Sequence, residues 1–321
     1  MKKKIVMTQI PTLSDIKRAH QRIEQYITET PVMTSKNVDE IAGCQLFFKC
    51  ENFQKVGAFK MRGAANAIFS IRPEDRVNGF ACHSSGNHGQ AVALASKLAG
   101  AKAYIVMPKN ASRVKVDAVR GYDAEVIFCE PNDASRTKAC EEVVAKTGAT
   151  LIHPFDDYSI IAGQATAAKE LMEKVEDLDA IIAPVGGGGL AAGTALLAHY
   201  LDPTMDIYLG EPEQVDDAFQ SLKAGKIIPN TTTDTIADGL RTTIGQKNFE
   251  IIKEHVKEVL TVSEEEIVAA MRLIWERMKI VIEPSCAVPF AAILRNPKIF
   301  EGKRVGVILT GGNVDLTKLP F

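Results

Sequence analysis

The stretch ENFQKVGAFKMRGA holds a lysine in apolar company. Lys60 lies between Phe59 and Met61, with Gly57 and Gly63 nearby in the sequence. Burial disfavours the ammonium form, so it lowers the pKa of a lysine and frees an amine that can attack a carbonyl carbon. Lys60 is therefore a candidate for Schiff-base chemistry. Taken alone, such a stretch more often marks a surface lysine whose stem covers apolar neighbours.

Four consecutive glycines, Gly186 to Gly189, follow an apolar run and open a helical pattern. Their N–H groups can crowd around an anion, and a helix N-terminus adds about half a positive charge. A phosphate is the natural ligand. A dinucleotide turn stays open, because Gly186, Gly188 and Ala191 fit GxGxxA and Glu211 follows at a fitting distance. A tight turn that binds no ligand is also an open alternative. Pyridoxal phosphate would need both a reactive lysine and an anion site.

The stretch ACHSSGNHGQA sets polar residues between an apolar run and a helical pattern. Ser84 and Ser85 are adjacent, and Asn87 and His88 follow after one glycine. One serine would serve such a junction, so Ser85 raises the question of a separate role. A hydroxyl that hydrogen-bonds the turn would be the plain structural explanation.

Two other stretches end apolar runs with polar side chains. Thr310 closes VILT before GGNVD, and a hydroxyl at the carboxyl end of a strand in an α/β sheet points toward the ligand crevice. A capped turn would explain it equally. Glu211, Asp216 and Asp217 in GEPEQVDD can bind Mg²⁺ or Ca²⁺. Acidic clusters of this kind are more often solvated loops.

Short apolar runs alternate with helical patterns and must position these residues. After a helix at 13–27, strands are predicted at 79–84, 101–108, 124–130, 150–155, 179–185, 205–211 and 303–310, with helices at 86–100, 112–123, 133–148, 186–201 and 263–280. Ser263 and Glu266 have the spacing of a capping box. Continuous apolar strands separated by helices indicate parallel sheets covered on both faces. The pattern predicts an α/β protein of two lobes with a ligand cleft between them.

Length and composition bound the class of protein. The 321 residues favour two domains, which we place at 79–152 and at 1–78 together with 153–321. A formal charge of −2 argues against nucleic acid or an anionic membrane as main partner. No apolar run reaches the roughly 18 residues of a membrane helix. Six scattered cysteines suit reduced thiols, so we expect a cytoplasmic protein.

In chain order, several stretches resemble the serine racemase and serine/threonine dehydratase family of pyridoxal-phosphate enzymes. They are KCENFQKVGAFKMRGA, SSGNHGQA, IAGQATAAKEL, PVGGGGLAAG, IADGL, MKIVIEPS and LTGGNVDL. The resemblance spans nearly the whole chain. It implies fold type II, similar to the tryptophan synthase β subunit, with two open twisted parallel-sheet lobes. It also implies a homodimer and mobility of the 79–152 lobe.

The resemblance implies roles for individual residues. Lys60 would form the Schiff base with pyridoxal phosphate and act as catalytic acid/base. The expected cofactor-binding residues are Phe59 against the ring, Asn87 at its 3-oxygen, Thr310 at its nitrogen, and Gly186, Gly187, Gly188 and Gly189 at the phosphate. The expected substrate-binding residues are Ser84, Ser85, Asn87, His88 and Arg136, which would meet the carboxylate and close over it.

Ser85 gains a role by the same resemblance. Lys60 serves one face of the substrate, and inversion of configuration needs a second acid/base on the opposite face. The racemases have a serine there, whereas plain dehydratases usually read serine-alanine-glycine-asparagine. Ser84-Ser85-Gly86-Asn87 is similar to the racemase branch. Dehydratases of 3-hydroxyaspartate also keep this serine.

The racemase branch further implies ligands besides pyridoxal phosphate. Glu211, Val215 and Asp217 match a divalent cation site for Mg²⁺, Mn²⁺ or Ca²⁺. Lys279 and Asn313 fall in segments where some members bind ATP as an effector. Only six residues follow Asp315, so we expect no regulatory domain after it.

The main hypothesis is a serine racemase that also eliminates water from L-serine, giving pyruvate and ammonia. The alternative is a dedicated dehydratase of threonine, serine or threo-3-hydroxyaspartate. A noncatalytic ligand-binding or regulatory protein ranks lower, because Lys60, the glycine loop and Thr310 are all retained. A NAD-binding oxidoreductase ranks last, because it leaves Lys60 and SSGNHGQ unexplained. Substrate preference is not predicted by the sequence.

Overall fold

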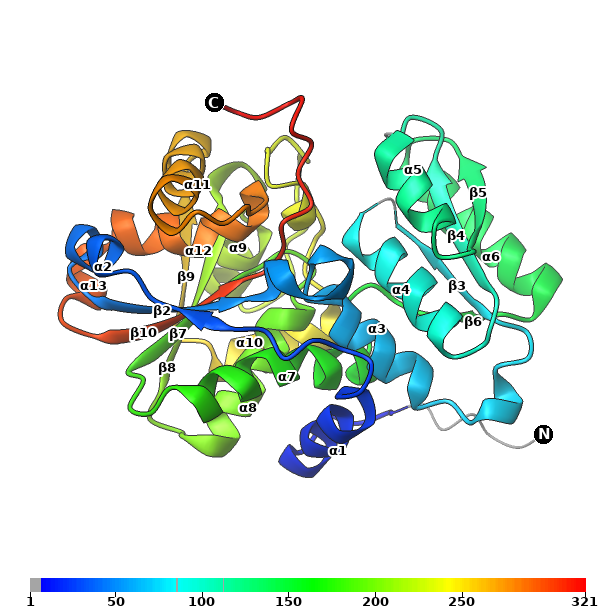
Figure 1. The fold of residues 1–321 in the computed structure, drawn as a ribbon, viewed down its shortest axis with the longest axis horizontal. Coiled ribbons are helices and arrows are strands. Elements are labelled where there is room, and N and C mark those ends of the chain that lie inside the picture. Colours follow the sequence, from blue (N-terminus) through cyan, green and yellow to red (C-terminus); the bar gives the residue numbers. More distant parts are fainter. Residues whose placement is uncertain (1–6, 85, 112) are drawn as a thin grey trace.

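The computed structural model describes residues 7–84, 86–111 and 113–321, which form two α/β lobes (Figure 1). The larger sheet has the order β1 (Val32–Met33), β2 (Gln45–Cys50), β10 (Arg304–Leu309), β7 (Ala180–Pro184), β8 (Asp206–Pro212), β9 (Glu258–Val262). The smaller sheet has the order β5 (Glu125–Cys129), β4 (Ala103–Pro108), β3 (Phe80–His83), β6 (Thr150–Leu151). The predicted α/β class is confirmed.

In the described part of the chain, every pair of named strands is parallel except one. The two-residue β1 runs antiparallel to β2, with Val32 opposite Lys49, so the larger sheet is mixed at this edge. The other pairs align the carboxyl ends of the strands along one edge of each sheet. Ligands of α/β proteins bind at that edge.

Helices cover both faces of the larger sheet, as its continuous apolar strands predict. One face packs against α2 (Lys36–Ala42), α11 (Glu264–Met278) and α12 (Pro284–Arg295). The other packs against α1 (Leu13–Ile23), α7 (Tyr158–Lys174), α8 (Gly189–Leu201) and α10 (Gln246–His255). The remaining helices here are α9 (Asp217–Ala224) and α13 (Pro297–Phe300). Neighbours in β7 divide between the cores: Ile182 faces the first and Ile181 the second.

The smaller sheet has α3 (Lys60–Phe69), α4 (Asn87–Leu98) and α5 (Arg113–Arg120) against one face. Helix α6 (Asp133–Thr147) contributes Cys140 to the core on the other face. Figure 1 shows α3 between the two sheets, and its residues pack on both α7 and α4. The helix that begins with Lys60 is thus held between the lobes.

Local signals in the sequence explain several helix ends. The predicted capping box at Ser263 and Glu266 is present, and Thr12 with Asp15 forms a second one at α1. Helix α1 ends at Ile23, four residues before the predicted end. Among the described residues, no helix is long and apolar enough to cross a bilayer.

One predicted strand is wrong beyond its start. Only Thr150 and Leu151 of the predicted strand 150–155 pair in the sheet. The chain then turns, because the His153 ring nitrogen Nδ1 accepts hydrogen bonds from the amides of Phe155 and Asp156 at 3.3 and 2.8 Å. This turn, rather than a strand, lies beside Lys60.

Candidate active site

Lys60 is the first residue of α3, at the carboxyl edge of the larger sheet. Its turn is tied to that sheet because the amide of Phe59 donates to the carbonyl of Thr310 at 3.0 Å, directly after β10. The Lys60 Nζ donates to the carbonyl of Pro154 at 3.0 Å and lies 5.1 Å from the centre of the Phe59 ring.

The surroundings of Lys60 destabilise its protonated form. Burial lowers the pKa of Lys60 to about 8, while the nearby Glu283 carboxylate opposes the shift. Near neutral pH an appreciable fraction of this lysine is therefore the free amine, the form that attacks an aldehyde. The predicted chemistry of Lys60 agrees with its environment.

The glycine loop lies between β7 and α8, with the helix beginning at Gly189. Gly188 has φ 91°, a conformation that favours glycine, and a Cβ on Gly187 would lie 2.3 Å from the Phe155 ring. Asn248 and the Gly245 amide bind the Gly187 carbonyl at 2.6 and 3.1 Å. Because the peptide is trans, the Gly188 N–H points away from Asn248.

This arrangement fits a phosphate. The first amides of a helix have no acceptor within it, and the helix dipole adds positive character there. A side chain at Gly186 would also meet the backbone of Leu240, at 2.8 Å from Cα. Glycine at these positions lets the loop lie this close to its neighbours.

Residues 154 and 155 connect the loop with the lysine. The Pro154 carbonyl accepts from Lys60, and the ring of the next residue, Phe155, covers Gly187. The Phe155 carbonyl accepts from Asn248 at 3.3 Å. The glycine loop and the amine therefore flank the same short segment, as one cofactor bound to both would require.

Asn87 reaches the same region from the smaller sheet. Its Nδ2 donates to both Glu283 carboxylate oxygens, at 2.9 and 3.1 Å, and its Oδ1 accepts from Asn313 at 2.9 Å. Burial, and then the Asp238 charge, raise the pKa of Glu283 to about 7. Glu283 was not predicted as a site residue, although it stands in the family-like stretch MKIVIEPS, directly before Pro284.

Thr310 and the remaining residues of the SSGN stretch lie near this centre. Thr310 is buried at the end of β10, next to the lysine turn. The Ser84 hydroxyl accepts from the Gly86 amide at 3.2 Å, before α4 begins. The predicted acid/base residue Ser85 lies outside the described residues.

His88 and Arg136 occupy different surroundings. His88 is buried, and its Nε2 lies 3.1 Å from the Ile152 carbonyl. Burial, with Lys60 nearby, lowers the pKa of His88 to about 3, so the ring is neutral. Arg136 is partly buried on α6, where its charge acts on the Cys129 thiol. Their expected contacts with a substrate stay predictions.

The acidic stretch buries two carboxylates. Glu211 and Asp217 are 0% and 1% exposed, and Val215 is buried between them in the sequence. Burial and the Asp217 charge raise the pKa of Glu211. Each carboxylate already accepts hydrogen bonds, Glu211 from the Ala218 and Phe219 amides and Asp217 from Asn230 and the Ile244 amide.

These carboxylates do not make a site of side chains alone. The described residues contain no group of three or more His, Cys, Asp or Glu side chains that could hold a metal ion. The predicted cation site relies on a backbone carbonyl of Val215 besides the two carboxylates, and it stays a prediction.

Comparison with known proteins agrees with this geometry. A family model described as pyridoxal-phosphate dependent enzyme matches residues 23–311. The chain is 50% identical to a beta-hydroxyaspartate dehydratase of Paracoccus denitrificans, over 97% of this chain and 99% of that protein. It is 51% identical to a serine racemase of Dictyostelium discoideum, over 96% of both chains.

The crystal structure of the Dictyostelium discoideum serine racemase superimposes with a TM-score of 0.91, covering 95% of this chain and 99% of that one. The family match includes Lys60, the glycine loop and the strand that ends before Thr310. On this ground, and on the fit of the lysine and the glycine loop to one cofactor, the chain belongs to the pyridoxal-phosphate dependent enzymes.

Proposed function

We propose that this protein interconverts L- and D-serine and also eliminates water from L-serine, giving pyruvate and ammonia. The observation that carries the proposal is the amine of Lys60, with its pKa lowered to about 8. It donates to the Pro154 carbonyl, next to the Phe155 ring that covers Gly187, and it feels the charge of Glu283, which binds Asn87. The likeness to a serine racemase at 51% identity supports it.

Several residues would hold pyridoxal phosphate. The amides of Gly186 to Gly189 take its phosphate, Asn87 its 3-oxygen, Thr310 its ring nitrogen, and Phe59 lies against the ring. When bound, the cofactor withdraws electrons from the substrate's α-carbon and so makes the α-hydrogen acidic.

The protein's own task is then to move one proton. Lys60 removes or returns the α-proton on one face of the substrate, and Ser85 does so on the opposite face. Ser84, Asn87 and the amides that open α4 hold the carboxylate, with His88 and Arg136 beside them. Loss of the β-hydroxyl after proton removal gives the elimination product instead.

Closure of the lobe 79–152 over the rest, residues 1–78 and 153–321, would exclude water from the site. An ion pair supports this motion: Lys115 of α5 lies 2.9 Å from Asp238, in the turn between Thr235 and Arg241. Asp238 also acts on Glu283, the partner of Asn87. A contact between the lobes is thus linked to the cofactor's surroundings.

Finer parts of the proposal rest on the resemblance. A divalent cation would bind Glu211, Asp217 and the carbonyl of Val215. The two carboxylates are buried, and a buried negative charge without a counter-charge is costly, so a cation there would stabilise both. A homodimer in the cytoplasm, and an ATP effector near Lys279 and Asn313, complete the expectation.

A dehydratase of 3-hydroxyaspartate is the second candidate. The observation in its favour is the 50% identity with the Paracoccus denitrificans beta-hydroxyaspartate dehydratase, which is as high as the likeness to the racemase. Both readings use Lys60 in the same way. They differ in the second carboxylate that such a substrate would carry.

Separate kinetic assays with each substrate distinguish the two functions. Purified protein with pyridoxal phosphate and Mg²⁺ would be given L-serine, L-threonine and L-threo-3-hydroxyaspartate separately, and kcat/KM measured for keto acid and for D-amino acid. The racemase proposal predicts D-serine formation at a rate comparable with that of pyruvate. A kcat/KM for hydroxyaspartate at least a hundredfold above that for serine, without D-serine, would establish the dehydratase instead.

A further inference from the structure

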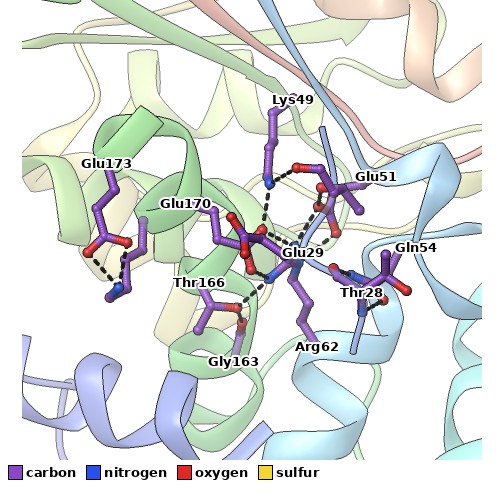
Figure 2. A network of polar contacts seen from close by, with 12 residues as sticks. Thr28, Glu29, Lys49, Glu51, Gln54, Arg62, Gly163, Thr166, Glu170 and Glu173 are labelled. Atoms are coloured by element: carbon purple, nitrogen blue, oxygen red, sulfur yellow. Dashed lines mark hydrogen bonds and ion pairs between the residues drawn. The ribbon is translucent and has the colours of Figure 1, made fainter. Parts of the chain in front are cut away.

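Figure 2 shows four charged side chains close together in the interior: Lys49, Glu51, Arg62 and Glu170. Lys49, Glu51 and Arg62 are 0% exposed and Glu170 is 3% exposed. We call these four residues the buried charge group. They come from β2, from the turn after it, from α3 and from α7, so they join elements far apart in the sequence.

Arg62 uses every N–H of its guanidinium. Nε and Nη2 donate to the two oxygens of Glu51 at 2.6 and 2.8 Å. Nη1 and Nη2 donate to the two oxygens of Glu170 at 2.7 Å each, and Nη1 also donates to Thr166 at 3.2 Å. Because the guanidinium is planar, two such forks fix its orientation as well as its position.

Lys49 completes the group. Its Nζ lies 2.5 Å from Glu170 and donates to the Thr30 carbonyl at 2.7 Å, while the Thr30 hydroxyl donates to Glu51 at 2.5 Å. Two cations thus meet two carboxylates. Although burial disfavours its charge, the Glu51 carboxylate holds the pKa of Arg62 above its usual range.

A buried group of charges is weak evidence for added stability. Taking four charges out of water costs about as much as their mutual attraction returns, and apolar side chains of similar volume often stabilise a fold better. What the charges add is a fixed orientation of the side chains that they join. The same region is already closely packed, since a Cβ on Gly163 of α7 would lie 2.7 Å from the Arg62 carbonyl.

Arg62 lies on the same helical turn as Lys60. It follows Lys60 by two residues, so the two side chains leave the first turn of α3 about 200° apart, on opposite sides. The N-cap residue of that helix, Phe59, makes no side-chain capping hydrogen bond. The buried charge group therefore holds the back of the turn while Lys60 projects from its front toward Pro154.

We infer that Arg62, clamped by Glu51 and Glu170, is a positioning residue that fixes the direction of the Lys60 amine toward the cofactor. The inference rests on the proposed role of Lys60 in carrying pyridoxal phosphate. It assigns a function to residues outside the catalytic and cofactor-binding set.

Arg62→Lys tests it, because lysine keeps the charge and loses both forks. The primary readout is the rate at which apoprotein attaches added pyridoxal phosphate to Lys60, trapped with borohydride and located by peptide mass spectrometry. We expect this rate to fall at least tenfold. We also expect kcat for the substrate to fall at least tenfold while KM changes less than threefold.

Two further variants separate positioning from stability. Phe300→Leu removes core packing against Tyr208, away from α3, and should lower the melting temperature while leaving the attachment rate unchanged. Arg62→Met with Glu51→Gln leaves Lys49 and Glu170 as an ion pair, with the Lys49 Nζ 2.5 Å from the carboxylate. It should regain thermal stability relative to Arg62→Met alone without regaining the attachment rate, and it carries the test if Arg62→Lys does not fold.

The inference is overturned if Arg62→Lys attaches the cofactor within twofold of the wild-type rate, or if the double variant recovers both properties. Failure of the proposed function has a different signature. In that case wild-type protein attaches pyridoxal phosphate at Lys60 but converts neither serine nor hydroxyaspartate, and the attachment rates still decide the role of Arg62.

Discussion

Replacing Gly187 by alanine is expected to weaken the binding of pyridoxal phosphate while the protein stays folded. The added Cβ would lie 2.3 Å from two atoms of the Phe155 ring and 2.5 Å from a third. Carbon atoms in contact prefer about 3.5–4.0 Å. Either the ring or the loop must therefore move by more than about 1 Å, and the ring is part of the segment that also receives Lys60.

The size of the effect follows from the cost of overpacking. One extra methyl group in a well-packed site typically costs about 1–3 kcal/mol. If that cost falls on the loop that holds the phosphate, the Kd for pyridoxal phosphate rises roughly 5- to 150-fold. The melting temperature of the apoprotein would report any part of the cost that falls on folding.

The assay is an equilibrium titration of apoprotein with pyridoxal phosphate, followed by absorbance. Gly121→Ala is the matched control, since its nearest contacts would be at 3.4 Å, an ordinary distance. In a Phe155→Ala background the obstacle is absent, so adding Gly187→Ala should cost much less. An unchanged Kd for Gly187→Ala, or an equal penalty in both backgrounds, would refute the reasoning.

Three other outcomes are expected. Attachment of pyridoxal phosphate to apoprotein should accelerate with pH and level off above about pH 8. The reason is that burial lowers the pKa of Lys60 to about 8 and only the free amine reacts. A rate that still rises steeply at pH 10 would mean that Lys60 has the pKa of an ordinary lysine. Ser85→Ala should suppress formation of D-serine while sparing pyruvate formation from L-serine, and equal loss of both would remove the two-face role of Ser85. Mg²⁺ or Ca²⁺ should raise the melting temperature of the wild-type protein but not of Asp217→Asn; a shift of the same size in the variant would place the cation elsewhere.

Much of the fold was predictable because its signals are local. The continuous apolar runs of β7, β8 and β10 require cover on both faces, and the capping box at Ser263 marks the start of α11. The strand predicted at 150–155 failed because the ring of His153 binds two backbone amides and turns the chain. Nothing in the local pattern of apolar residues shows that contact.

The site was predictable only in part, because some of its residues gain their roles from contacts between distant parts of the chain. Lys60 and the glycine loop stand out by residue type and neighbours, so each could be found alone. Glu283, Arg62 and Glu170 gain their roles from partners 196 or 108 residues away in the sequence. In the sequence alone a buried arginine cannot be told from a surface arginine, because the carboxylates that pair with it come from distant parts of the chain.

In the proposed function, Lys60 is required both for interconversion of L- and D-serine and for elimination of water from L-serine. The most direct test of this requirement is incubation of wild-type protein and Lys60→Ala with L-serine, pyridoxal phosphate and Mg²⁺, with D-serine and pyruvate measured in the same tube. We expect both products from the wild-type protein and neither from the variant. Products from Lys60→Ala at a comparable rate, or neither product from a wild-type protein that has bound the cofactor, would contradict it.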